Sequence, residues 1–259
     1  MDRLLKKARI LNRILQNASD HVDFGAVAAS LNELIHANVY LIDCDGKVLG
    51  CSFLPGYSCK TMLRIAEQAG VPSGVNEELL SVMETKANFH QGSNACIFRR
   101  RTPCLYKNVV ATVVPIVGAG TRLGTVILAK FNRQFAVSDL ILAEHGATVV
   151  GMEIFRSRME KMAEEARKRA AVQVALGTLS YSELDAVRHI FGELGKEEGL
   201  LVASKIADRA GITRSVIVNA LRKFESAGVI EARSLGMKGT YIRVLNDQLL
   251  DELKRYKGA

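Results

Sequence analysis

Residues 203–224 read ASKIADRAGITRSVIVNALRKF, and this stretch decides how the C-terminal part of the chain folds. Ser204 is placed to cap a short helix, and Gly211 offers the positive φ that ends it. Thr213 is placed to cap a second helix. The apolar residues of this second helix recur at helical spacing and should be buried: Val216, Ile217, Ala220, Leu221 and Phe224. Two helices joined by a glycine turn predict a helix-turn-helix.

The opposite face of the second helix is polar and carries residue types that hydrogen-bond base edges or phosphates in a DNA major groove. We expect Arg214, Ser215 and Asn219 to read bases. The complete set of expected DNA-binding residues is Ser204, Lys205, Thr213, Arg214, Ser215, Val218, Asn219, Arg222, Lys223, Lys238 and Thr240.

Residues 229–235 and 240–245 are strand-like and are joined by the turn GMKG at 236–239. They predict a β-hairpin with a basic tip, which is the wing of a winged helix and would touch backbone phosphates. The alternative is a small α+β packing module with a solvated charged face.

Charge favours the nucleic-acid interpretation. Residues 204–243 contain eight Lys or Arg and three Asp or Glu, a balance of +5, and the whole chain carries +8 with a pI near 9.3. Counterion release would use such a local excess. The 259 residues have room for two domains, without an apolar run long enough for a membrane span or a signal core. A cytoplasmic location is expected.

The five cysteines, Cys44, Cys51, Cys59, Cys96 and Cys104, are odd in number and form no Cys-x-x-Cys pair. Reduced thiols are therefore the expectation, with a redox role as the alternative. The sequence offers no phosphate loop, nucleophile elbow or metal-ligand spacing, so we expect neither an enzyme nor a metal site.

The N-terminal part reads as helices over 3–17 and 24–36, strands over 38–43 and 48–53, and helices over 61–69 and 75–83. An irregular segment over 84–108 and two strands over 109–117 and 123–130 follow. This order suits an antiparallel sheet flanked by helices, as in sensing domains of the GAF or PAS type. Such a domain would close a pocket between Met62, Ile65, Val71 and Val75 on one side and Cys96, Ile97 and Phe98 on the other; the alternative is plain core.

A long helix is predicted from Ser138-Asp139, where Ser138 would cap it and Asp139 would face its positive end, to about Leu176. Ser180 and Glu183 then form a capping box for the next helix. We expect an effector-binding domain at 1–155, a linker helix at 156–178 and a winged helix-turn-helix domain at 179–259.

Several stretches closely resemble the CodY family, the nutrient-responsive repressors of low-GC Gram-positive bacteria. They are 11–18 (LNRILQNA), 139–154 (DLILAEHGATVVGMEI), 179–184 (LSYSEL), 199–209 (GLLVASKIADR), 211–222 (GITRSVIVNALR), 225–230 (ESAGVI) and 233–242 (RSLGMKGTYI). The resemblance implies an α+β chain with an N-terminal GAF domain that binds branched-chain amino acids. It also implies a C-terminal winged helix-turn-helix, a homodimer, repression of starvation genes and, in many members, GTP sensing.

The sensor domain departs from this family pattern. Members that bind isoleucine carry arginine at the position of Thr61, so a buried carboxylate would lack its counterion here unless Lys60, Arg64, Arg99 or Arg100 replaces it. The expected effector residues are Met62, Ile65, Val71, Val75, Cys96, Phe98, Arg99 and Arg100. Members proposed to bind GTP carry basic residues where this chain has Cys44 and Asp45, and the carboxylates of Asp43 and Asp45 would repel a triphosphate.

The sequence and this resemblance together predict a homodimeric repressor of a near-palindromic, A/T-rich operator; the resemblance implies control by a branched-chain amino acid such as isoleucine or by GTP. The rival from another class is a ligand-binding or thiol-redox sensor whose C-terminal module contacts a protein partner.

Overall fold

The computed structural model of the chain describes residues 2–17, 22–67, 70–90, 95–194 and 197–256; the side chains of 2, 15–17, 95, 99–102 and 237 are not described. The chain divides into two compact units, Met1–Met159 and Glu160–Ala259. The boundary falls within one helix, α5 (Val137–Gly177), and each unit has its own hydrophobic core.

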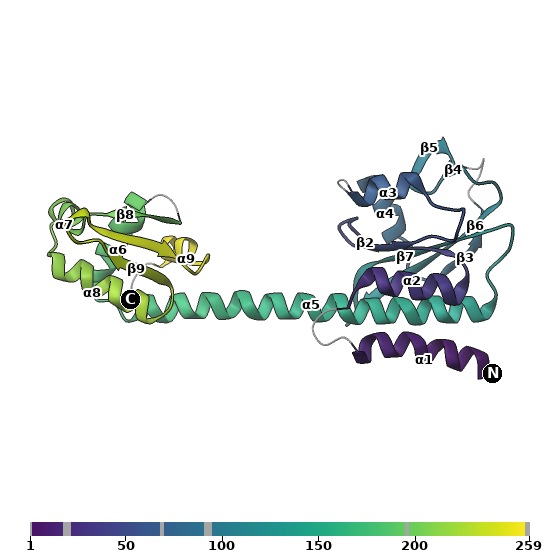
Figure 1. Cartoon of the computed structure of the whole chain (residues 1–259), viewed down its shortest axis with the longest axis horizontal. Coiled ribbons are helices and arrows are strands. Elements are labelled where there is room, and N and C mark those ends of the chain that lie inside the picture. The colour runs from purple at the N-terminus through teal and green to yellow at the C-terminus, as the bar shows by residue number, and fades with distance from the viewer. Residues whose placement is uncertain (1, 18–21, 68–69, 91–94, 195–196, 257–259) are drawn as a thin grey trace. The chain divides into compact units, whose positions relative to one another are not determined.

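The first unit contains a five-stranded sheet in the order β2-β1-β7-β6-β3 with antiparallel neighbours (Figure 1). Its strands are β1 (Asn38–Asp43), β2 (Val48–Ser52), β3 (Lys86–Phe89), β6 (Val109–Gly118) and β7 (Thr121–Phe131). The predicted antiparallel sensor sheet is therefore confirmed. The predicted irregular segment over 84–108 was wrong in part, because it contains β3 and a separate hairpin of β4 (Ala95–Cys96) and β5 (Arg99–Pro103).

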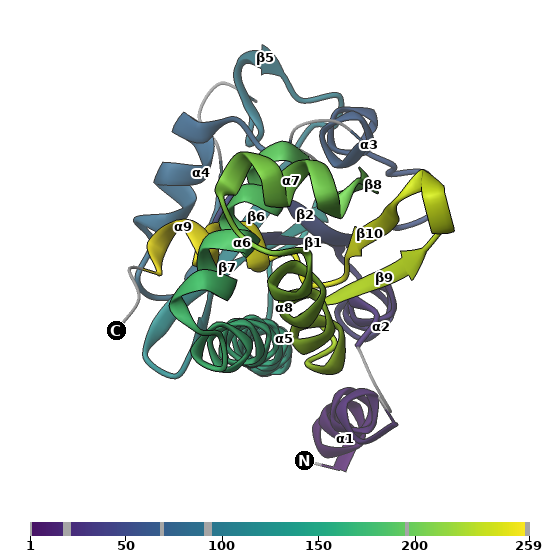
Figure 2. The same ribbon diagram turned by 90° about the vertical axis from the view of Figure 1, so that its left-hand side faces the viewer.

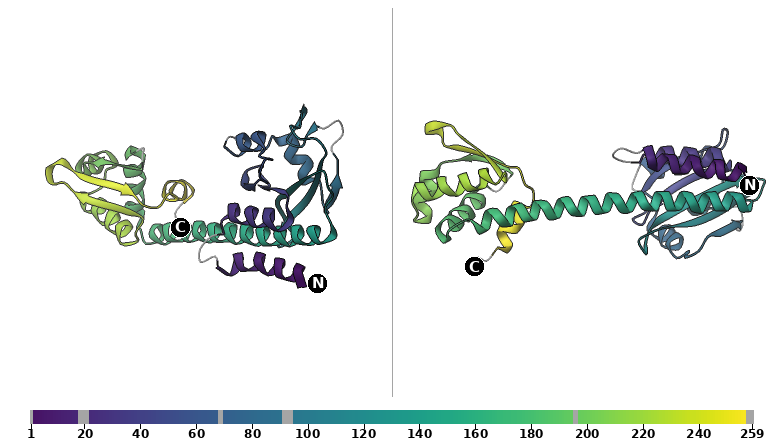
Figure 3. Two further views of the ribbon diagram at one scale, coloured as in Figure 1. Left: turned by 45° about the vertical axis from the view of Figure 1, so that its right-hand side comes forward. Right: turned by 90° about the horizontal axis from the view of Figure 1, so that it is seen from below.

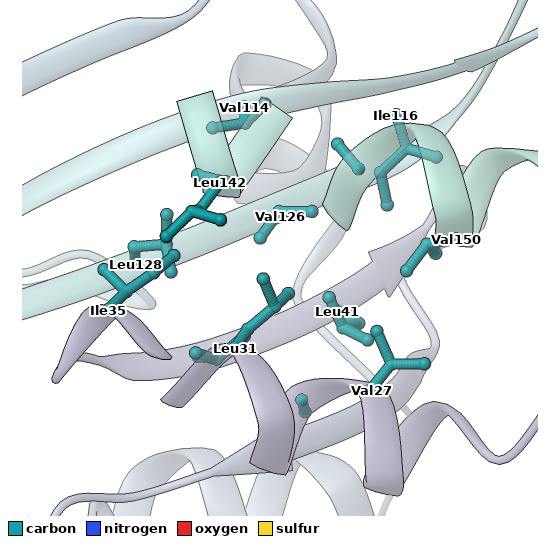
Figure 4. Close-up of a cluster of buried hydrophobic side chains, with 14 of the residues drawn as sticks. Val27, Leu31, Ile35, Leu41, Val114, Ile116, Val126, Leu128, Leu142 and Val150 are labelled. Atoms are coloured by element: carbon teal, nitrogen blue, oxygen red, sulfur yellow. The ribbon is translucent and has the colours of Figure 1, made fainter. Parts of the chain in front are cut away.

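Alternating side chains divide the sheet into two apolar faces. Val39 and Leu41 of β1 point to one face, where α2 (Phe24–Ile35) and α5 cover them. Figure 4 shows this core, with Leu31 of α2 and Leu142 of α5 meeting the sheet residues. Tyr40 and Ile42 point to the other face, which α3 (Lys60–Glu67) and α4 (Ser73–Leu80) cover (Figure 1).

Helix α1 (Asp2–Asn17) is amphipathic, as predicted, and lies alongside α5 in the first unit (Figure 3). Leu11 is fully buried in the core shared with α2 and α5. His145 of α5 contacts Asn12 of α1, with 2.7 Å between Nε2 and Oδ1.

The predicted cap of the long helix was wrong by two residues. Helix α5 begins at Val137, so Ser138 lies inside it and cannot be the cap. Asp139 does stabilise the first turn, because its carboxylate accepts hydrogen bonds from the Ala136 amide at 3.0 Å and from Lys130 Nζ at 2.5 Å.

The second unit combines helices with a three-stranded sheet of order β8-β10-β9, and Figure 2 views it end-on. Its elements are α6 (Tyr181–Leu194), β8 (Glu198–Leu201), α7 (Ala203–Ala210), α8 (Arg214–Ser226), β9 (Ile230–Ser234), the short 3-10 helix η2 (Gly236–Lys238), β10 (Thr240–Val244) and α9 (Leu249–Arg255). The apolar face of α8 is buried at Ile217, Ala220, Leu221 and Phe224, while Val216 is half-buried. The predicted winged helix-turn-helix is confirmed, with β8 as a strand that sequence reasoning did not name.

Local signals at the helix ends had different outcomes. The capping box is confirmed: the Ser180 amide donates to Glu183 Oε2 at 2.8 Å, and the Glu183 amide donates to Ser180 Oγ at 3.3 Å. The prediction that Ser204 caps α7 was wrong, because the helix begins at Ala203 and its N-cap position is Val202. The strand β8 ends at Leu201, and α7 begins two residues before the start that a Ser204 cap would give.

Candidate nucleic-acid interface and ligand cavity

Helix α8 exposes a continuous polar face, which we call the recognition face: Arg214, Ser215, Asn219 and Arg222. Among the described residues, neither Arg214 nor Arg222 takes part in an ion pair, so both guanidinium groups are available to an external acceptor. Thr213 occupies the N-cap position but makes no side-chain capping bond; its hydroxyl lies 2.8 Å from that of Ser215. Val218 is half-buried beside this face.

Lys223 is not part of the recognition face, although the sequence suggested it. Its ammonium donates to Glu183 Oε2 at 2.7 Å and to the Thr178 carbonyl at 2.9 Å. Burial of the Glu183 carboxylate opposes its ionisation, but hydrogen bonds from Lys223 and Ser180 outweigh burial and lower the pKa of Glu183. Lys223 therefore holds α8 against the N-terminal end of α6, and its predicted phosphate contact would have to compete with this ion pair.

The turn between α7 and α8 has the predicted geometry. Gly211 adopts φ 66°, and its amide donates to the Ala207 carbonyl, which ends α7 in a left-handed cap. Ser204 and Lys205 are exposed on the first turn of α7. Arg209 of α7 forms an ion pair with Glu193 of α6, with 2.5 Å between Nη1 and Oε1, and this pair connects α7 to α6.

The wing is the hairpin of β9 and β10, whose tip presents Lys238 to solvent. Gly239 adopts φ 111°, and a Cβ there would lie 2.4 Å from the Leu201 carbonyl oxygen of β8. Only glycine permits this close approach, which lets Thr240 pair with Leu201 and Ser234 at once. Thr240 is half-buried at the base of the wing.

The first unit contains a cavity of about 60 Å³ on the β4–β5 side of its sheet. Three cysteines face it, and we call it the thiol-lined cavity. Its lining residues are Asn38, Tyr40, Cys59, Cys96, Ile97, Phe98, Cys104, Tyr106, Val109, Ala111, Ile127, Ala129 and Phe131. All of these lining side chains are neutral.

Aromatic rings build the walls of the cavity. The rings of Tyr40 and Phe98 meet edge to face at 5.1 Å, and Tyr57 stacks on Phe131 at 3.9 Å. Tyr106 donates from its hydroxyl to the Ser58 carbonyl at 2.9 Å, which fixes its ring. Burial raises the pKa of the Tyr40 phenol and of the Cys59 thiol, so both stay protonated at neutral pH.

The predicted pocket and effector residues fall into four groups. Cys96, Ile97 and Phe98 line the thiol-lined cavity. Met62, Ile65 and Val71 are buried in the adjoining apolar cluster but do not line the cavity, while Val75 faces a separate hollow beside Leu79. The side chains of Arg99 and Arg100 lie outside the described part of the structure.

Sequence reasoning missed the cavity residues that β1, β6 and β7 supply, which are Asn38, Tyr40, Val109, Ala111, Ile127, Ala129 and Phe131. The signal that could have found them is the alternation of side chains along each strand. Tyr40 and Ile127 belong to the cluster on the α3 side, whereas their neighbours Val39 and Leu128 belong to the opposite core.

The turn between β1 and β2 is closed by its own contacts. Asp43 Oδ1 accepts from the amides of Asp45 and Lys47 at 2.9 and 2.8 Å. Arg158 of α5 donates to Cys44 Sγ at 2.9 Å. The Arg158 guanidinium, which lies beside this turn, is therefore already hydrogen-bonded to a residue of the turn.

Comparisons with known proteins agree with this architecture. Residues 3–178 match the model of the CodY GAF-like domain, and residues 197–257 match that of the CodY helix-turn-helix domain. A "Global transcriptional regulator CodY" from Clostridium botulinum (strain Eklund 17B / Type B) is 54% identical over 260 residues, covering 99% of this chain and 100% of the relative. The same-named protein of strain Okra / Type B1 is 54% identical over 259 residues, with the same coverage.

Among solved structures, the cofactor binding GAF domain of the nutrient sensor CodY from Clostridium difficile is 31% identical. It covers 58% of this chain and 97% of its own, with a TM-score of 0.41. In the described part of the chain, no helix has the length and apolar character that crossing a bilayer requires.

The fold and the helix-turn-helix define a DNA-binding transcriptional regulator with an N-terminal GAF domain. More specifically, the two matched domains and the full-length relatives show that the chain belongs to the CodY family.

Proposed function

We propose that this chain acts as a homodimeric repressor of amino-acid metabolism and starvation genes, presenting two winged helices to a near-palindromic operator. The observation that carries the proposal is the recognition face, where Arg214 and Asn219 are exposed on the outer side of α8. These side chains match the acceptors of guanine and the donor-acceptor pair of adenine in the major groove. Residues 179–259 would form the DNA-binding domain, and 156–178 the linker.

Phosphate contacts would come from cations around the recognition face. Lys205 at the start of α7, Arg222 on α8 and Lys238 at the wing tip are all exposed. Ser204, Thr213 and Thr240 would add hydroxyl donors. Because such contacts displace condensed counterions, DNA affinity should fall steeply as salt is raised.

An apolar stripe on α5 supports the homodimer. Met152, Phe155, Met159 and Met162 are exposed, and they repeat at intervals of three and four residues. That spacing places them on one side of the helix, as in a coiled-coil seam. A second copy of α5 would cover the stripe.

The first unit would sense a small effector in the thiol-lined cavity and alter DNA affinity when the effector binds. The family resemblance makes branched-chain amino acids and GTP the first ligands to test. We propose no catalytic role, and we place the protein in the cytoplasm, where its DNA target lies.

Arg214→Ala tests the recognition face. Loss of a bidentate base contact should cost about 1–3 kcal/mol of binding free energy on operator DNA and much less on random DNA. Fluorescence anisotropy at two salt concentrations measures both.

Arg167→Ala is the matched control, because it removes the same charge from an exposed position on α5. Arg167→Ala should weaken binding to operator DNA, and to random DNA, much less than Arg214→Ala weakens binding to operator DNA. Equal losses of Arg214→Ala on operator and random DNA would assign Arg214 to the phosphate backbone and would overturn its role in reading sequence.

A further inference from the structure

We propose that Met152, Met159 and Met162 of α5 form an oxidation site that controls whether two copies of the chain stay together. A hypohalous acid, such as hypochlorous acid, converts their thioethers to sulfoxides, and the sulfoxides disfavour pairing of the two α5 helices and so weaken DNA binding. This inference rests on the homodimer of the proposed function. It goes beyond that homodimer because it names a chemical modification that breaks it.

The three methionines lie on one side of an exposed helix. They are three of the seven methionines in the chain, and they all fall between 152 and 162. Their exposed fractions are 58%, 48% and 62%, and Phe155 between them is 38% exposed. Intervals of three and four residues place all four side chains in one apolar stripe. In a single copy of the chain these thioethers are therefore open to an oxidant in solution.

Thioethers differ from thiols in what they need for oxidation. A thioether has no proton to lose, so access to the sulfur largely decides its oxidation. A thiol reacts as its thiolate. Burial raises the pKa of Cys59, and Cys96 is buried. The methionine stripe is therefore a more accessible target than these two cysteines of the thiol-lined cavity.

The reaction is a two-electron oxidation at sulfur. A sulfur lone pair attacks the chlorine of hypochlorous acid, and water then displaces chloride from sulfur. One sulfur–oxygen bond forms and the oxygen–chlorine bond of the acid is lost. Sulfur loses two electrons, chlorine gains two and leaves as chloride, and the net release is one proton. The product is a polar sulfoxide where an apolar side chain stood.

A sulfoxide oxygen buried between two helices needs a hydrogen-bond donor. The donors one helical turn away from the methionines are already directed to other acceptors. Thr148 Oγ1 donates to the backbone carbonyl four residues before it at 3.0 Å. The Arg156 guanidinium donates to the Glu153 carboxylate at 2.8 and 3.0 Å, and Arg158 donates to Cys44 Sγ at 2.9 Å. A sulfoxide in the seam would have to break one of these bonds or stay without a partner, and both disfavour association.

Loss of the dimer should reach the DNA complex without any change in α8. Two linked recognition faces bind the two half-sites of a near-palindromic operator with a combined affinity that neither has alone. Oxidation of separated copies prevents them from pairing again. The operator is then bound by single copies, and its affinity falls.

Limited treatment of the full-length protein with hypochlorous acid tests the inference. Dithiothreitol then reduces disulfides and sulfenic acids but leaves methionine sulfoxides in place. Mass spectrometry quantifies oxidation at each methionine, with Met83, which is 76% exposed, and the fully buried Met62 as internal references. Analytical ultracentrifugation measures the dissociation constant of the dimer before and after treatment.

The stripe methionines should be oxidised as readily as Met83, while Met62 is spared. The dissociation constant of the dimer should rise roughly tenfold or more, because both copies bring sulfoxides into the seam. Operator affinity should fall as well, measured in a Met237→Leu background so that the wing methionine takes no part. An unchanged dissociation constant after full oxidation of the stripe would overturn the inference and leave the homodimer standing. A protein that is monomeric before treatment would overturn both.

Variants assign the effect to the stripe. In the triple variant Met152→Leu, Met159→Leu, Met162→Leu, treatment should leave the dissociation constant where it was before treatment. Met83→Leu and Cys44→Ser should remain as sensitive as the unchanged protein. Met159→Gln brings a neutral polar group into the seam without any oxidant and should raise the dissociation constant roughly tenfold, whereas Met83→Gln should not. Equal dissociation constants for the two glutamine variants, or sensitivity that is lost in Cys44→Ser, would overturn the inference.

Discussion

The recognition face and the thiol-lined cavity are built in opposite ways. The first consists of polar side chains from consecutive turns of a single helix, all pointing outward and free of ion pairs within the described residues. The second gathers neutral side chains from β1, β4, β6, β7 and the loops between them, and the Asn38 amide and the Tyr106 hydroxyl are engaged in hydrogen bonds within the chain.

This difference explains what each region can recognise. An outward row of cations and amides offers charge to a polyanion at little desolvation cost, because water still reaches it. An enclosed cavity with mostly apolar walls selects largely by shape. Variants in the two regions should therefore differ in the kind of effect as well as in its size.

The largest expected effect is that of Phe224→Ala, on the inner side of the helix that bears the recognition face. Phe224 is fully buried and lies 6.2 Å from the Phe191 ring, so its truncation should cost about 3–5 kcal/mol of unfolding free energy. Phe98→Ala should cost less, because that ring already borders empty space. Urea unfolding followed by circular dichroism compares the two, and an equal or larger loss for Phe98→Ala would mean that the cavity is not a void.

A smaller effect is expected at the wing. Gly239→Ala forces a Cβ to within 2.4 Å of the Leu201 carbonyl oxygen at φ 111°, and should cost about 1–3 kcal/mol and weaken DNA binding. Gly236→Ala is the matched control, since it also has positive φ (63°) but no atom within 4 Å of the added Cβ, and it should cost only about 1 kcal/mol. The same unfolding assay ranks them, and the reverse order would contradict the contact between the wing and β8.

The ion pair of Lys223 and Glu183 should make the second unit sensitive to acid. Because the pKa of Glu183 is lowered below its ordinary value of 4.5, the stabilisation is fully present above that pH and is lost as pH falls through the lowered pKa. Glu183→Gln keeps the shape of the capping box and should cost about 1 kcal/mol at pH 7 and less at pH 3. A penalty that is unchanged between these pH values would show that charge is not what matters there.

The smallest effect on stability is expected at Arg222, the residue before Lys223. Arg222→Ala should change the unfolding free energy by less than about 0.5 kcal/mol, because this guanidinium is exposed and unpaired in the described structure. It should nevertheless weaken DNA binding on all sequences and reduce the salt slope by about 1. Lys223→Ala is the matched comparison, and it should lower the unfolding free energy because it breaks the ion pair with Glu183.

Much of the fold followed from local patterns. The glycine at 211, the apolar spacing along α8 and the box formed by Ser180 and Glu183 depend on neighbours within a few residues, and the structure has each of them in place. The short strands β3, β4, β5 and β8 were not predicted. Their pairing partners lie elsewhere in the chain, and their few residues carry little periodicity.

The candidate sites divide in the same way. The recognition face could be predicted because all of its residues lie on one helix. The ion pair of Lys223 could not be predicted, because its partner Glu183 is 40 residues away and no pattern connects them. The cavity was only half anticipated: Cys96 and Phe98 line it, while Met62 and Val71 lie in the core alongside, because a cavity depends on how separate segments leave space between them.

Helix α5 supplies buried side chains near both of its ends, Leu142 to Ile154 in one core and Val172 to Leu176 in the other, but between 155 and 171 it buries no side chain within the chain. Most helical stability in proteins comes from packing of an apolar face, and this stretch gains little of it within the chain. The backbone amides of residues 155–171 should therefore exchange with deuterium well before those at either end of α5. Each unit should also be able to unfold independently of the other. If a second copy covers the stretch, dilution alone would speed that exchange.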